Sequence, residues 1–346
     1  MRAILVKGGK GPSSSLYLSD NVPIPKINHG EVLIKVKAFA LNRMDILQRN
    51  GSYPLPEGAS EILGVEFSGT ISQFSANGSI TNQFQIGDRV YGLVLGGAYA
   101  EYVVCREELL FKIPDSVTYE TAASIPEVWL TAVQVVKTVG QLKRCDKFMF
   151  HAGASGVGQA AIQIALGEGA SKVFCTVGSD MKKEFISSQL LVKGRKQEDL
   201  IPINYHSEDF VSVINDVTSS KGVDLIVDPV GQCYFNKNLE ALAPGGRLVN
   251  MGTMSGGIVE NANIGMILYK RLRVEGTTLR ARSLEYKVAL KAAFEQDVLP
   301  CIIANKYKHI IDKVFDWEDI VSAHDYMESN QSMGKVVVRV TENKQL

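Results

Sequence analysis

Short runs of apolar residues, alternating with polar ones or bounded by Gly, Pro, Asn and Asp, fill the first third of the chain. Runs of this kind predict strands rather than helices. We expect strands at 3–6, 31–41, 64–74, 88–94 and 98–104. The region up to about residue 113 is therefore predicted to be all-β, in the form of a distorted barrel.

The pattern changes near Val117. Residues 116–140 contain helix-starting residues, alanines and apolar positions at helical spacing. Beyond them, apolar strands alternate with helical segments, and we expect these strands at 147–153, 172–178, 223–231 and 246–252. Such alternation is typical of βαβ units around a parallel sheet. The sequence thus predicts a second domain of α/β type.

Two segments are less sharply defined. Residues 190–201 are polar and aperiodic, and we interpret them as a surface insertion between a crossover helix and the next strand, without chemistry of its own. The part from residue 272 onward has strand-like runs around helical patterns at 284–298 and 317–330. The pattern alone lets this part complete either domain.

Composition and charge narrow the classes of function. The 346 residues are 45% hydrophobic and 21% charged, which allows two domains at about 150 residues each. Lys plus Arg and Asp plus Glu number 37 each, so no net field attracts nucleic acid or an anionic membrane. The first residues lack an apolar signal core, and no stretch approaches the ~18 apolar residues of a membrane span. We expect a cytoplasmic protein with neither partner. The five cysteines stand singly, which predicts reduced, mostly structural thiols.

A glycine-rich loop at residues 151–158 is the strongest local signal. It follows a strand that ends near Phe150 and precedes a helical pattern. Glycines there let backbone N–H groups approach a pyrophosphate at the positive end of the helix. The spacing, G-x-x-G-x-G, also fits a plain strand-to-helix turn, but the flanking βαβ pattern favours a dinucleotide site. The residues expected to contact the cofactor are Gly153, Ser155, Gly156, Val157 and Gly158.

The end of the second strand of this domain bears on the choice of cofactor. An NAD site usually carries an acidic residue about 20 residues beyond the glycines. Gly178 and Ser179 stand there instead, with Lys182 close by, and these side chains favour the extra phosphate of NADPH. Asp180 argues mildly for NAD, and Lys182 with Lys183 also fits a solvated helix face.

Seven segments, spread over nearly the whole chain, carry a family resemblance: ALNRMDILQRNGSYP (40–54), GVEFSG (64–69), GDRVYGLVLGGAYAEYV (87–103), AASIPEVWLTA (122–132), HAGASGVG (151–158), INYHSEDF (203–210) and GKVVV (334–338). Together they resemble the zeta-crystallin-like quinone oxidoreductases, a group of medium-chain dehydrogenases/reductases, and their PIG-three-like branch in particular. The resemblance implies an α/β fold with a Rossmann doubly wound parallel sheet and a GroES-like β-barrel.

The same resemblance implies how the domains divide the chain. It places residues 1–124 and 281–346 in the GroES-like catalytic domain and 125–280 in the Rossmann NADP-binding domain. In that family the nicotinamide lies in a cleft between the two domains. A homodimer joined through the edge of the Rossmann sheet is also implied.

Zinc ligands of related alcohol dehydrogenases are replaced in this chain. Those relatives have a Cys three residues before an Asp, and a His in a G-H-E motif. Here the corresponding residues are Asn42, three residues before Asp45, and Val65, followed by Glu66. Neither Asn nor Val is a credible zinc ligand, and the relatives' second cysteine cluster is missing as well. We therefore expect no metal, and no Lewis acid for alcohol oxidation.

By resemblance, Asn42 and Tyr53 line the substrate side of the cleft. Asn42 would offer an amide donor to a carbonyl oxygen, and Tyr53 a phenol or a stacking face. Without the resemblance, a turn-capping Asn and a loop Tyr are the simpler interpretations. The resemblance also assigns further residues to the cofactor, each with an ordinary structural alternative: Thr131, Tyr205, Gly252, Thr253, Leu279, Arg280 and Lys335. We do not expect His151 to be catalytic, because it ends a buried strand.

Three functions remain open from the sequence. The first is an enzyme, an NADPH:quinone oxidoreductase that reduces quinones or similar electron-poor carbonyl compounds without zinc. The second is an enoyl or alkenal reductase, or another medium-chain dehydrogenase with a different acceptor. The third is a non-enzymatic nucleotide- or RNA-binding protein, which the neutral net charge disfavours.

Overall fold

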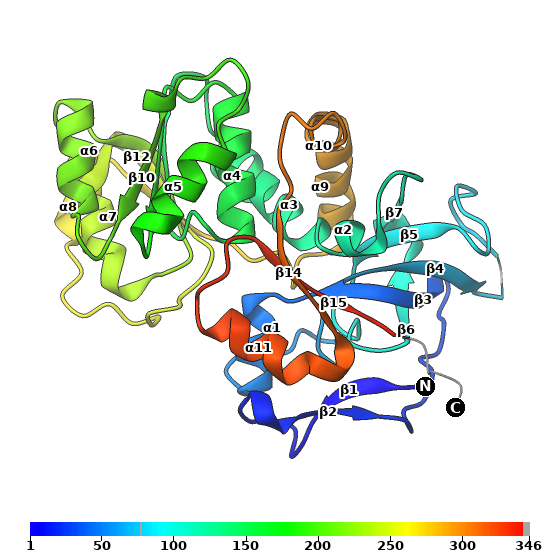
Figure 1. Cartoon of the computed structure of the whole chain (residues 1–346). Coiled ribbons are helices and arrows are strands. Elements are labelled where there is room, and N and C mark those ends of the chain that lie inside the picture. Colours follow the sequence, from blue (N-terminus) through cyan, green and yellow to red (C-terminus); the bar gives the residue numbers. More distant parts are fainter. Residues whose placement is uncertain (77, 342–346) are drawn as a thin grey trace. The chain divides into compact units, whose positions relative to one another are not determined.

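A computed structural model describes residues 1–76 and 78–341 (Figure 1). The described chain divides into two compact units. Unit 1 contains residues 1–127, 280–288 and those from 310 onward, and unit 2 contains 128–279 and 289–309. Each unit has its own sheet.

Unit 1 is built on a mostly antiparallel sheet centred on one long strand. In sheet order the strands are β14 (Ile311–Asp316), β15 (Lys335–Arg339), β3 (Glu31–Ala40), β4 (Glu66–Phe74), β5 (Arg89–Leu93) and β7 (Leu110–Lys112), and β6 (Tyr102–Arg106) also pairs with β3. Within this sheet β14 and β15 pair in parallel, and a separate ribbon joins β1 (Ala3–Val6) to β2 (Leu16–Ser19). Because β15 pairs with β3, the end of the described chain completes the sheet begun near its start. This sheet confirms the predicted GroES-like domain.

Three helices belong to unit 1: α1 (Arg43–Arg49), α2 (Tyr119–Ala123) and α11 (Ile320–Glu328). Figure 1 shows α11 beside α1, although they lie far apart in the sequence. The contact includes Arg49 Nη1 and His324 Nδ1, 2.9 Å apart. The core beneath holds large side chains that are almost fully buried, including Phe39, Phe67, Tyr99 and Trp317. The apolar positions of the strands supply most of this core, as their pattern predicts.

Unit 2 is a six-stranded parallel sheet with the strand order of a doubly wound fold. The order is β10 (Leu200–Asn204), β9 (Lys172–Val177), β8 (Lys147–Phe150), β11 (Val223–Asp228), β12 (Leu242–Asn250) and β13 (Arg273–Gly276). The order reverses between β8 and β11, and ligands of such sheets bind beyond the carboxyl ends of the strands at this point. The glycine-rich loop follows β8, so it lies at the reversal. The Rossmann prediction is confirmed.

Helices connect the strands of unit 2: α4 (Gly156–Gly167), α5 (Asp180–Gln189), α6 (Phe210–Thr218), α7 (Phe235–Ala241) and α8 (Ile264–Lys270). The helix α10 (Leu299–Ile303) also belongs to unit 2 and comes after its last strand. Two more, α3 (Pro126–Val133) and α9 (Leu284–Asp297), run across the unit boundaries. Short 3-10 turns occur at Ser13–Ser15, Glu107–Leu109, Gln197–Asp199, Gln232–Tyr234 and Trp317–Asp319, and a π-helical turn at Gln134–Thr138.

The structure differs from the sequence prediction in the placing of residues 289–309. They belong to unit 2, whereas the sequence analysis grouped all of 281–346 with the barrel. Tyr307 explains the difference, because its ring stacks on Trp129, with centroids 6.0 Å apart, and its hydroxyl lies directly against Gly167 of α4. The backbone N of Lys308 also donates to Gln163 Oε1 at 2.6 Å.

Several element limits differ from the predicted ones. The strand expected at 98–104 begins only at Tyr102, because the chain first turns at Gly97 with φ 98°. The strand expected at 246–252 begins earlier, at Leu242. The last two residues of the expected insertion at 190–201 belong to β10, which starts at the buried Leu200. Of the helices in the described residues, none combines the length and the apolar character that crossing a membrane requires.

Candidate active site

The glycine-rich loop of unit 2 leads from β8 into α4. Ser155 is the N-cap of α4, and its Oγ accepts a hydrogen bond from the backbone N of Gly158 at 3.1 Å. A Cβ on Gly158 would lie 2.6 Å from the Ala152 carbonyl oxygen, and one on Gly153 would lie 2.7 Å from Cys175 Sγ. Neither position has room for a side chain. The loop therefore stays tight against the sheet and presents a helix N-terminus suited to a pyrophosphate.

The remaining loop residues line the same turn. Gly153 and Gly158 are buried, Gly156 and Val157 are half-buried, and Ser155 is exposed at the tip. The structure thus brings together the five residues that the sequence analysis assigned to the cofactor, and their arrangement fits a dinucleotide.

The end of β9 gathers the residues expected near the extra phosphate of NADPH. A Cβ on Gly178 would lie 2.7 Å from the hydroxyl of Tyr205, whose side chain is 45% exposed. Ser179 is the N-cap of α5, and its Oγ accepts a hydrogen bond from the backbone N of Lys182 at 3.2 Å. Gly178, Ser179, Lys182 and Tyr205 therefore lie together, beside the start of α5.

Neighbouring charges at this end of unit 2 are paired. Lys183 Nζ lies 2.6 Å from Glu208 Oε2, so Lys183 is not simply a solvated helix charge. Asn204 Nδ2 donates to Asp180 Oδ1 at 2.9 Å, which gives the acidic residue that argued for NAD a partner within the protein.

Thr131, on α3 in unit 2, carries a buried hydroxyl without a hydrogen-bond partner among the described residues. Its hydroxyl therefore makes no hydrogen bond back to its own helical turn. Buried hydroxyls in native proteins almost always have partners, so this one is suited to an external ligand. A carboxamide such as that of nicotinamide would satisfy it.

The segments after β12 and β13 supply three more residues assigned to the cofactor, namely Gly252, Thr253 and Leu279. A Cβ on Gly252 would lie 2.8 Å from the Pro229 carbonyl oxygen, which explains the glycine. Thr253 is exposed beside it, and Leu279, at the end of this part of unit 2, is 5% exposed.

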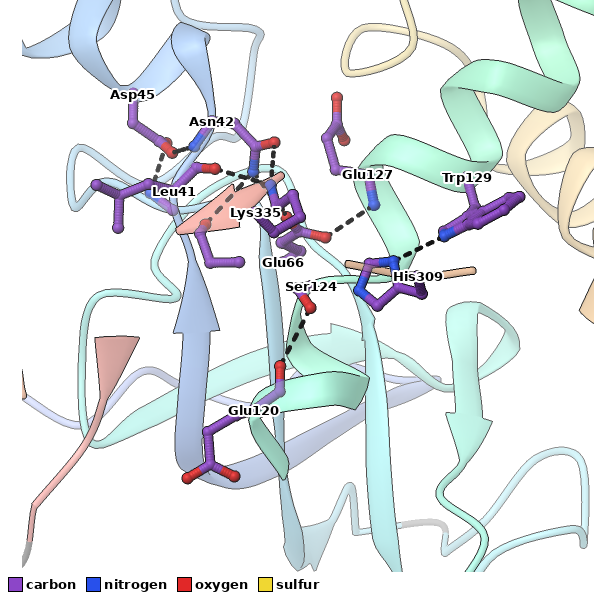
Figure 2. A network of polar contacts seen from close by, with 12 residues as sticks. Leu41, Asn42, Asp45, Glu66, Glu120, Ser124, Glu127, Trp129, His309 and Lys335 are labelled. Carbon is purple, nitrogen blue, oxygen red and sulfur yellow. Dashed lines mark hydrogen bonds and ion pairs between the residues drawn. The ribbon is translucent and has the colours of Figure 1, made fainter. Parts of the chain in front are cut away.

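Unit 1 contains a group of buried polar residues, here called the polar cluster. Each member is at most 9% exposed: Asn42, Asp45, Gln48, Glu66, Glu127, Arg280 and Lys335. Its centre is an ion pair between Lys335 Nζ and Glu66 Oε1 at 2.8 Å (Figure 2). Lys335 Nζ also donates to the Leu41 carbonyl oxygen at 2.7 Å and to Asn42 Oδ1 at 2.8 Å. Three oxygens thus surround the ammonium group.

Two residues expected to face ligands are held inside this cluster. Asn42 Nδ2 donates to Glu66 Oε1 at 2.9 Å, so both ends of the amide have partners within the protein. Lys335, expected on the cofactor side, has its ammonium group in the ion pair with Glu66. Asp45 holds the backbone here, because its Oδ2 accepts from the Asn42 N at 2.8 Å. The structure gives Asn42 and Lys335 a positioning role.

Arg280, expected to pair with a phosphate, also lies in the polar cluster. Its Nε donates to the Leu95 carbonyl oxygen at 2.7 Å and its Nη1 to Gln48 Oε1 at 2.9 Å. Its Nη2 is buried and lacks a hydrogen-bond partner within the described part of the chain. The guanidinium carbon lies 5.3 Å from the ring centroid of the half-buried Tyr53. An unused N–H donor and a phenol therefore lie together.

Burial shifts the acidity of several groups in the cluster. It raises the pKa of Glu127 to about 7, and the negative charge of Glu66 adds to this rise. Burial also raises the pKa of Asp45 to about 6, against the hydrogen bonds that its carboxylate accepts from Asn42 and Gly64. The pKa of Tyr53 is raised by burial too. Glu127 is thus poised to exchange a proton near neutral pH.

Two family models match the chain: the alcohol dehydrogenase GroES-like domain over residues 28–115, and a model described as zinc-binding dehydrogenase over residues 199–338. The chain belongs to the medium-chain dehydrogenase/reductase family.

Relatives of this dehydrogenase/reductase include human quinone oxidoreductase, 28% identical over 345 residues, which covers 98% of this chain and 97% of that protein. Highly-reducing polyketide synthase 1 of Aureobasidium melanogenum is 29% identical over 331 residues, or 95% of this chain, but the chain spans only 14% of that protein's length. Among solved structures, Escherichia coli quinone oxidoreductase complexed with NADPH has a TM-score of 0.83 at 26% identity, covering 98% of this chain and 100% of that one.

The two positions that the resemblance relates to zinc ligands are both enclosed by unit 1. Val65 is 1% exposed in the core of unit 1, and Asn42 is tied to Lys335 and Glu66. Over residues 1–76 and 78–341, no three His, Cys, Asp or Glu side chains are grouped so that they could hold a metal ion.

His151 is fully buried, as expected for the end of a strand. Its Nε2 lies 2.7 Å from Asn238 Oδ1, and its Nδ1 lies 3.1 Å from Thr176 Oγ1. Burial lowers the pKa of His151, which keeps the ring neutral. These contacts hold the start of the glycine-rich loop, because Thr176 Oγ1 also accepts from the Ala152 N at 3.1 Å.

The sequence analysis missed four members of the polar cluster: Asp45, Gln48, Glu66 and Glu127. A signal for two of them was present. Glu66 stands in an apolar strand pattern, and Glu127 stands in an apolar helical run directly after Pro126. A charged residue inside a run that is otherwise buried needs partners, and this is how such sites are found.

Proposed function

We propose that the protein is an NADPH-dependent oxidoreductase that reduces quinones or similar electron-poor carbonyl compounds without zinc. The observation that carries the proposal is that Asn42, at a position where the resemblance implies a zinc ligand in related dehydrogenases, is hydrogen-bonded to Lys335 and Glu66 and supplies no metal ligand. The likeness to quinone oxidoreductases supports the choice of acceptor.

The residues of unit 2 fit a dinucleotide. The glycine-rich loop and the N-terminus of α4 would hold the pyrophosphate, and the unpartnered hydroxyl of Thr131 would hold the carboxamide. Ser179, Lys182 and Tyr205 would take the extra phosphate, and Gly252, Thr253 and Leu279 would line the ribose side. When bound, NADPH supplies a hydride. The residues of unit 1 would orient the carbonyl acceptor, with Tyr53 as the stacking face or phenol donor.

Titration calorimetry with NADPH and then NADH tests the cofactor, together with an elemental assay for zinc. We expect tighter binding of NADPH and no stoichiometric zinc. Lys182→Ala and Tyr205→Phe should each weaken NADPH by about tenfold, the effect of losing one contact of about 1.4 kcal/mol, and should leave NADH unchanged. Lys193→Ala, in the loop before β10, is the control. Preference of the wild-type protein for NADH, or one zinc per chain, would contradict the proposal.

A reductase of conjugated carbon–carbon double bonds is the second candidate. The match to a highly-reducing polyketide synthase favours it. Turnover across a panel of quinones and α,β-unsaturated carbonyl compounds separates the two. Activity with quinones supports the first candidate, and activity confined to enoyl compounds supports the second.

We also propose that the protein is a homodimer joined at the edge of the unit 2 sheet. The outermost strand, β13, has a free edge, and α8 precedes it directly. Apolar side chains are exposed on and around these two elements: Ile258, Ile264, Leu268, Tyr269 and Val274. A second copy of the same edge would cover both the strand and these side chains.

A further inference from the structure

Glu127 is a buried acid. Within residues 1–76 and 78–341, no hydrogen bond or ion pair holds its carboxyl group. Its side chain is at the start of α3, directly after Pro126, and the residue is 6% exposed. Its backbone N donates to Glu66 Oε2 at 2.9 Å. Figure 2 draws this backbone contact, and no dashed line reaches the Glu127 carboxyl group. A buried carboxyl group without partners has a large desolvation cost when it is ionised.

Glu66, the neighbouring acid, is the opposite case. Its Oε1 accepts from Asn42 Nδ2 at 2.9 Å and pairs with Lys335 Nζ at 2.8 Å, while its Oε2 accepts from the Glu127 N. The ammonium charge of Lys335 is therefore offset by Glu66. A second negative charge on Glu127 would lack a cation of its own at contact distance.

The charged groups around Glu127 explain why it holds a proton near neutral pH. Glu66 and Asp45 disfavour its ionised form, whereas Lys335 and Arg280 favour it. Lys287 is a further cation nearby, and its Nζ is bound to the Arg280 carbonyl oxygen at 2.7 Å. Burial outweighs these cations, and the pKa of Glu127 is raised to about 7. General acids work best when their pKa lies near the working pH.

Arg280 adds a second observation that points to a ligand. It is 3% exposed, and its Nη2 lacks a partner in residues 1–76 and 78–341. The charges of Arg280 and Glu127 act on each other, and both act on the phenol of Tyr53. A guanidinium N–H, a phenol and an acid therefore belong to one group of polar side chains in unit 1, in which the guanidinium carbon lies 5.3 Å from the phenol ring. A carbonyl oxygen that becomes negative during reduction would satisfy the guanidinium donor.

We propose that Glu127 donates the proton that completes the reduction of the carbonyl acceptor, and that Arg280 Nη2 holds the oxygen that receives it. This proposal rests on the proposed function. The acceptor gains two electrons and one hydrogen as hydride, which leaves a negative oxygen. The O–H bond of Glu127 breaks as the new O–H bond forms on the acceptor. The Glu127 carboxylate then regains a proton from water.

The dependence of kcat/KM on pH tests this role, with NADPH and the best quinone of the panel. For the wild-type protein we expect a plateau at low pH and a tenfold fall per pH unit above about pH 7, where Glu127 loses its proton. Glu127→Gln should lower kcat/KM by about 10²-fold and abolish this fall, because a general acid contributes about 10²–10⁴-fold. Glu127→Asp should restore part of the rate and the pH dependence.

A matched control comes from the same region of the chain. Glu120 is half-buried and its Oε1 accepts from Arg339 Nε at 2.9 Å, so Glu120→Gln removes a carboxylate outside the polar cluster. This control variant should have the same pH profile of kcat/KM as the wild-type protein. NADPH affinity, measured by calorimetry, should be equal in all four proteins, since Glu127 is not among the cofactor residues.

A second measurement does not depend on turnover. Infrared difference spectra between pH 6 and pH 8 should show a protonated carboxyl band that disappears in the wild-type protein, and Glu127→Gln should lose the Glu127 part of this band and keep only the part from Asp45, whose pKa is about 6. If Glu127→Gln turned over and its kcat/KM still fell above about pH 7 as in the wild-type protein, Glu127 would not be the proton donor, and the proposed function would remain. Absence of turnover by the wild-type protein with every acceptor would overturn the proposed function and, with it, the role of Glu127.

Discussion

Lys335 is enclosed by unit 1, 4% exposed, and its ammonium group contacts oxygen atoms of three residues: Leu41, Asn42 and Glu66. Such a pair is costly to bury but far more costly to break, because the remaining charge then lacks compensation. In this respect the polar cluster is like other buried polar networks, in which each polar group is hydrogen-bonded to a neighbouring one. Among the described residues, the Glu127 carboxyl group and Arg280 Nη2 have no such hydrogen-bond partner. We propose a ligand as the partner of both.

Replacing Lys335 by Met should lower the free energy of unfolding of unit 1 by about 3–5 kcal/mol, because Glu66 would be left as an uncompensated buried charge. Urea unfolding at neutral pH measures this. The double variant Lys335→Met/Glu66→Gln should recover part of the loss. Lys112→Met is the control, since its side chain is 58% exposed in an ion pair of 3.1 Å with Asp88 and should cost less than about 1 kcal/mol. A loss for Lys335→Met no greater than for Lys112→Met would contradict the prediction.

Glu127 should also affect how stability depends on pH. Burial raises the pKa of Glu127 in the folded protein to about 7 from its ordinary value of 4.5, so the folded state binds more protons than the unfolded state between these values. The stabilising effect is present in full below pH 4.5 and is lost as the pH rises through about 7. Between pH 4.5 and about pH 7, the free energy of unfolding of Glu127→Gln should rise by on the order of 3 kcal/mol relative to that of the wild-type protein. Denaturant unfolding of both proteins across this range measures the gain, and a constant difference would contradict it.

At the scale of elements, the start of α4 is the feature that the cofactor proposal needs most. The loop between β8 and α4 leaves no space for side chains at two of its glycines, and Ser155 caps the helix. The local pattern therefore already determines most of this element: a buried strand, a glycine-rich turn and an N-cap follow directly in the chain. The same is true of Ser179 at the start of α5.

Gly158→Ala should weaken NADPH binding by at least about tenfold, because the new Cβ would lie 2.6 Å from the Ala152 carbonyl oxygen and the loop must shift. Calorimetric titration checks this. Gly276→Ala is the matched control, since its Cβ would meet its nearest neighbour, the Asn250 carbonyl oxygen, only at 4.0 Å. Equal affinities for the two variants would show that the loop is not the cofactor site.

At the scale of the whole molecule, the proposed homodimer predicts the mass of the protein in solution. Light scattering should give a mass twice the 37.8 kDa of one chain. Leu268→Glu, on the 73% exposed residue of α8, should shift the protein to the mass of one chain, because it places a charge in the proposed interface. Ile86→Glu, on a 66% exposed residue of unit 1, should leave the mass unchanged. A wild-type mass of one chain would refute the dimer.

The sequence by itself determined the two sheets and the glycine-rich loop. The two-residue period of the first third and the alternation of strands and helices after Val117 are local patterns, and a local pattern needs only its own segment to be recognised. The α/β fold followed from these patterns, whereas the family was implied by the resemblance of seven longer segments. The helical patterns near 284–298 and 317–330 were recognised as well, although not the unit to which 289–309 belongs.

Only the tertiary structure decided what the polar residues do. Asn42, Glu66, Glu127, Arg280 and Lys335 are separated by up to 293 residues along the chain, and the pairing of β15 with β3 is what brings the last of them to the first. Sequence reasoning treated Asn42, Arg280 and Lys335 as separate ligand contacts and passed over the two acids. Burial and charge partners decide the pKa of a carboxyl group, and both depend on residues that the fold brings together rather than on neighbours in the sequence. For that reason the chain's sequence predicted where a cofactor fits, and only the tertiary structure brought together the buried groups on which the proposed proton donor rests.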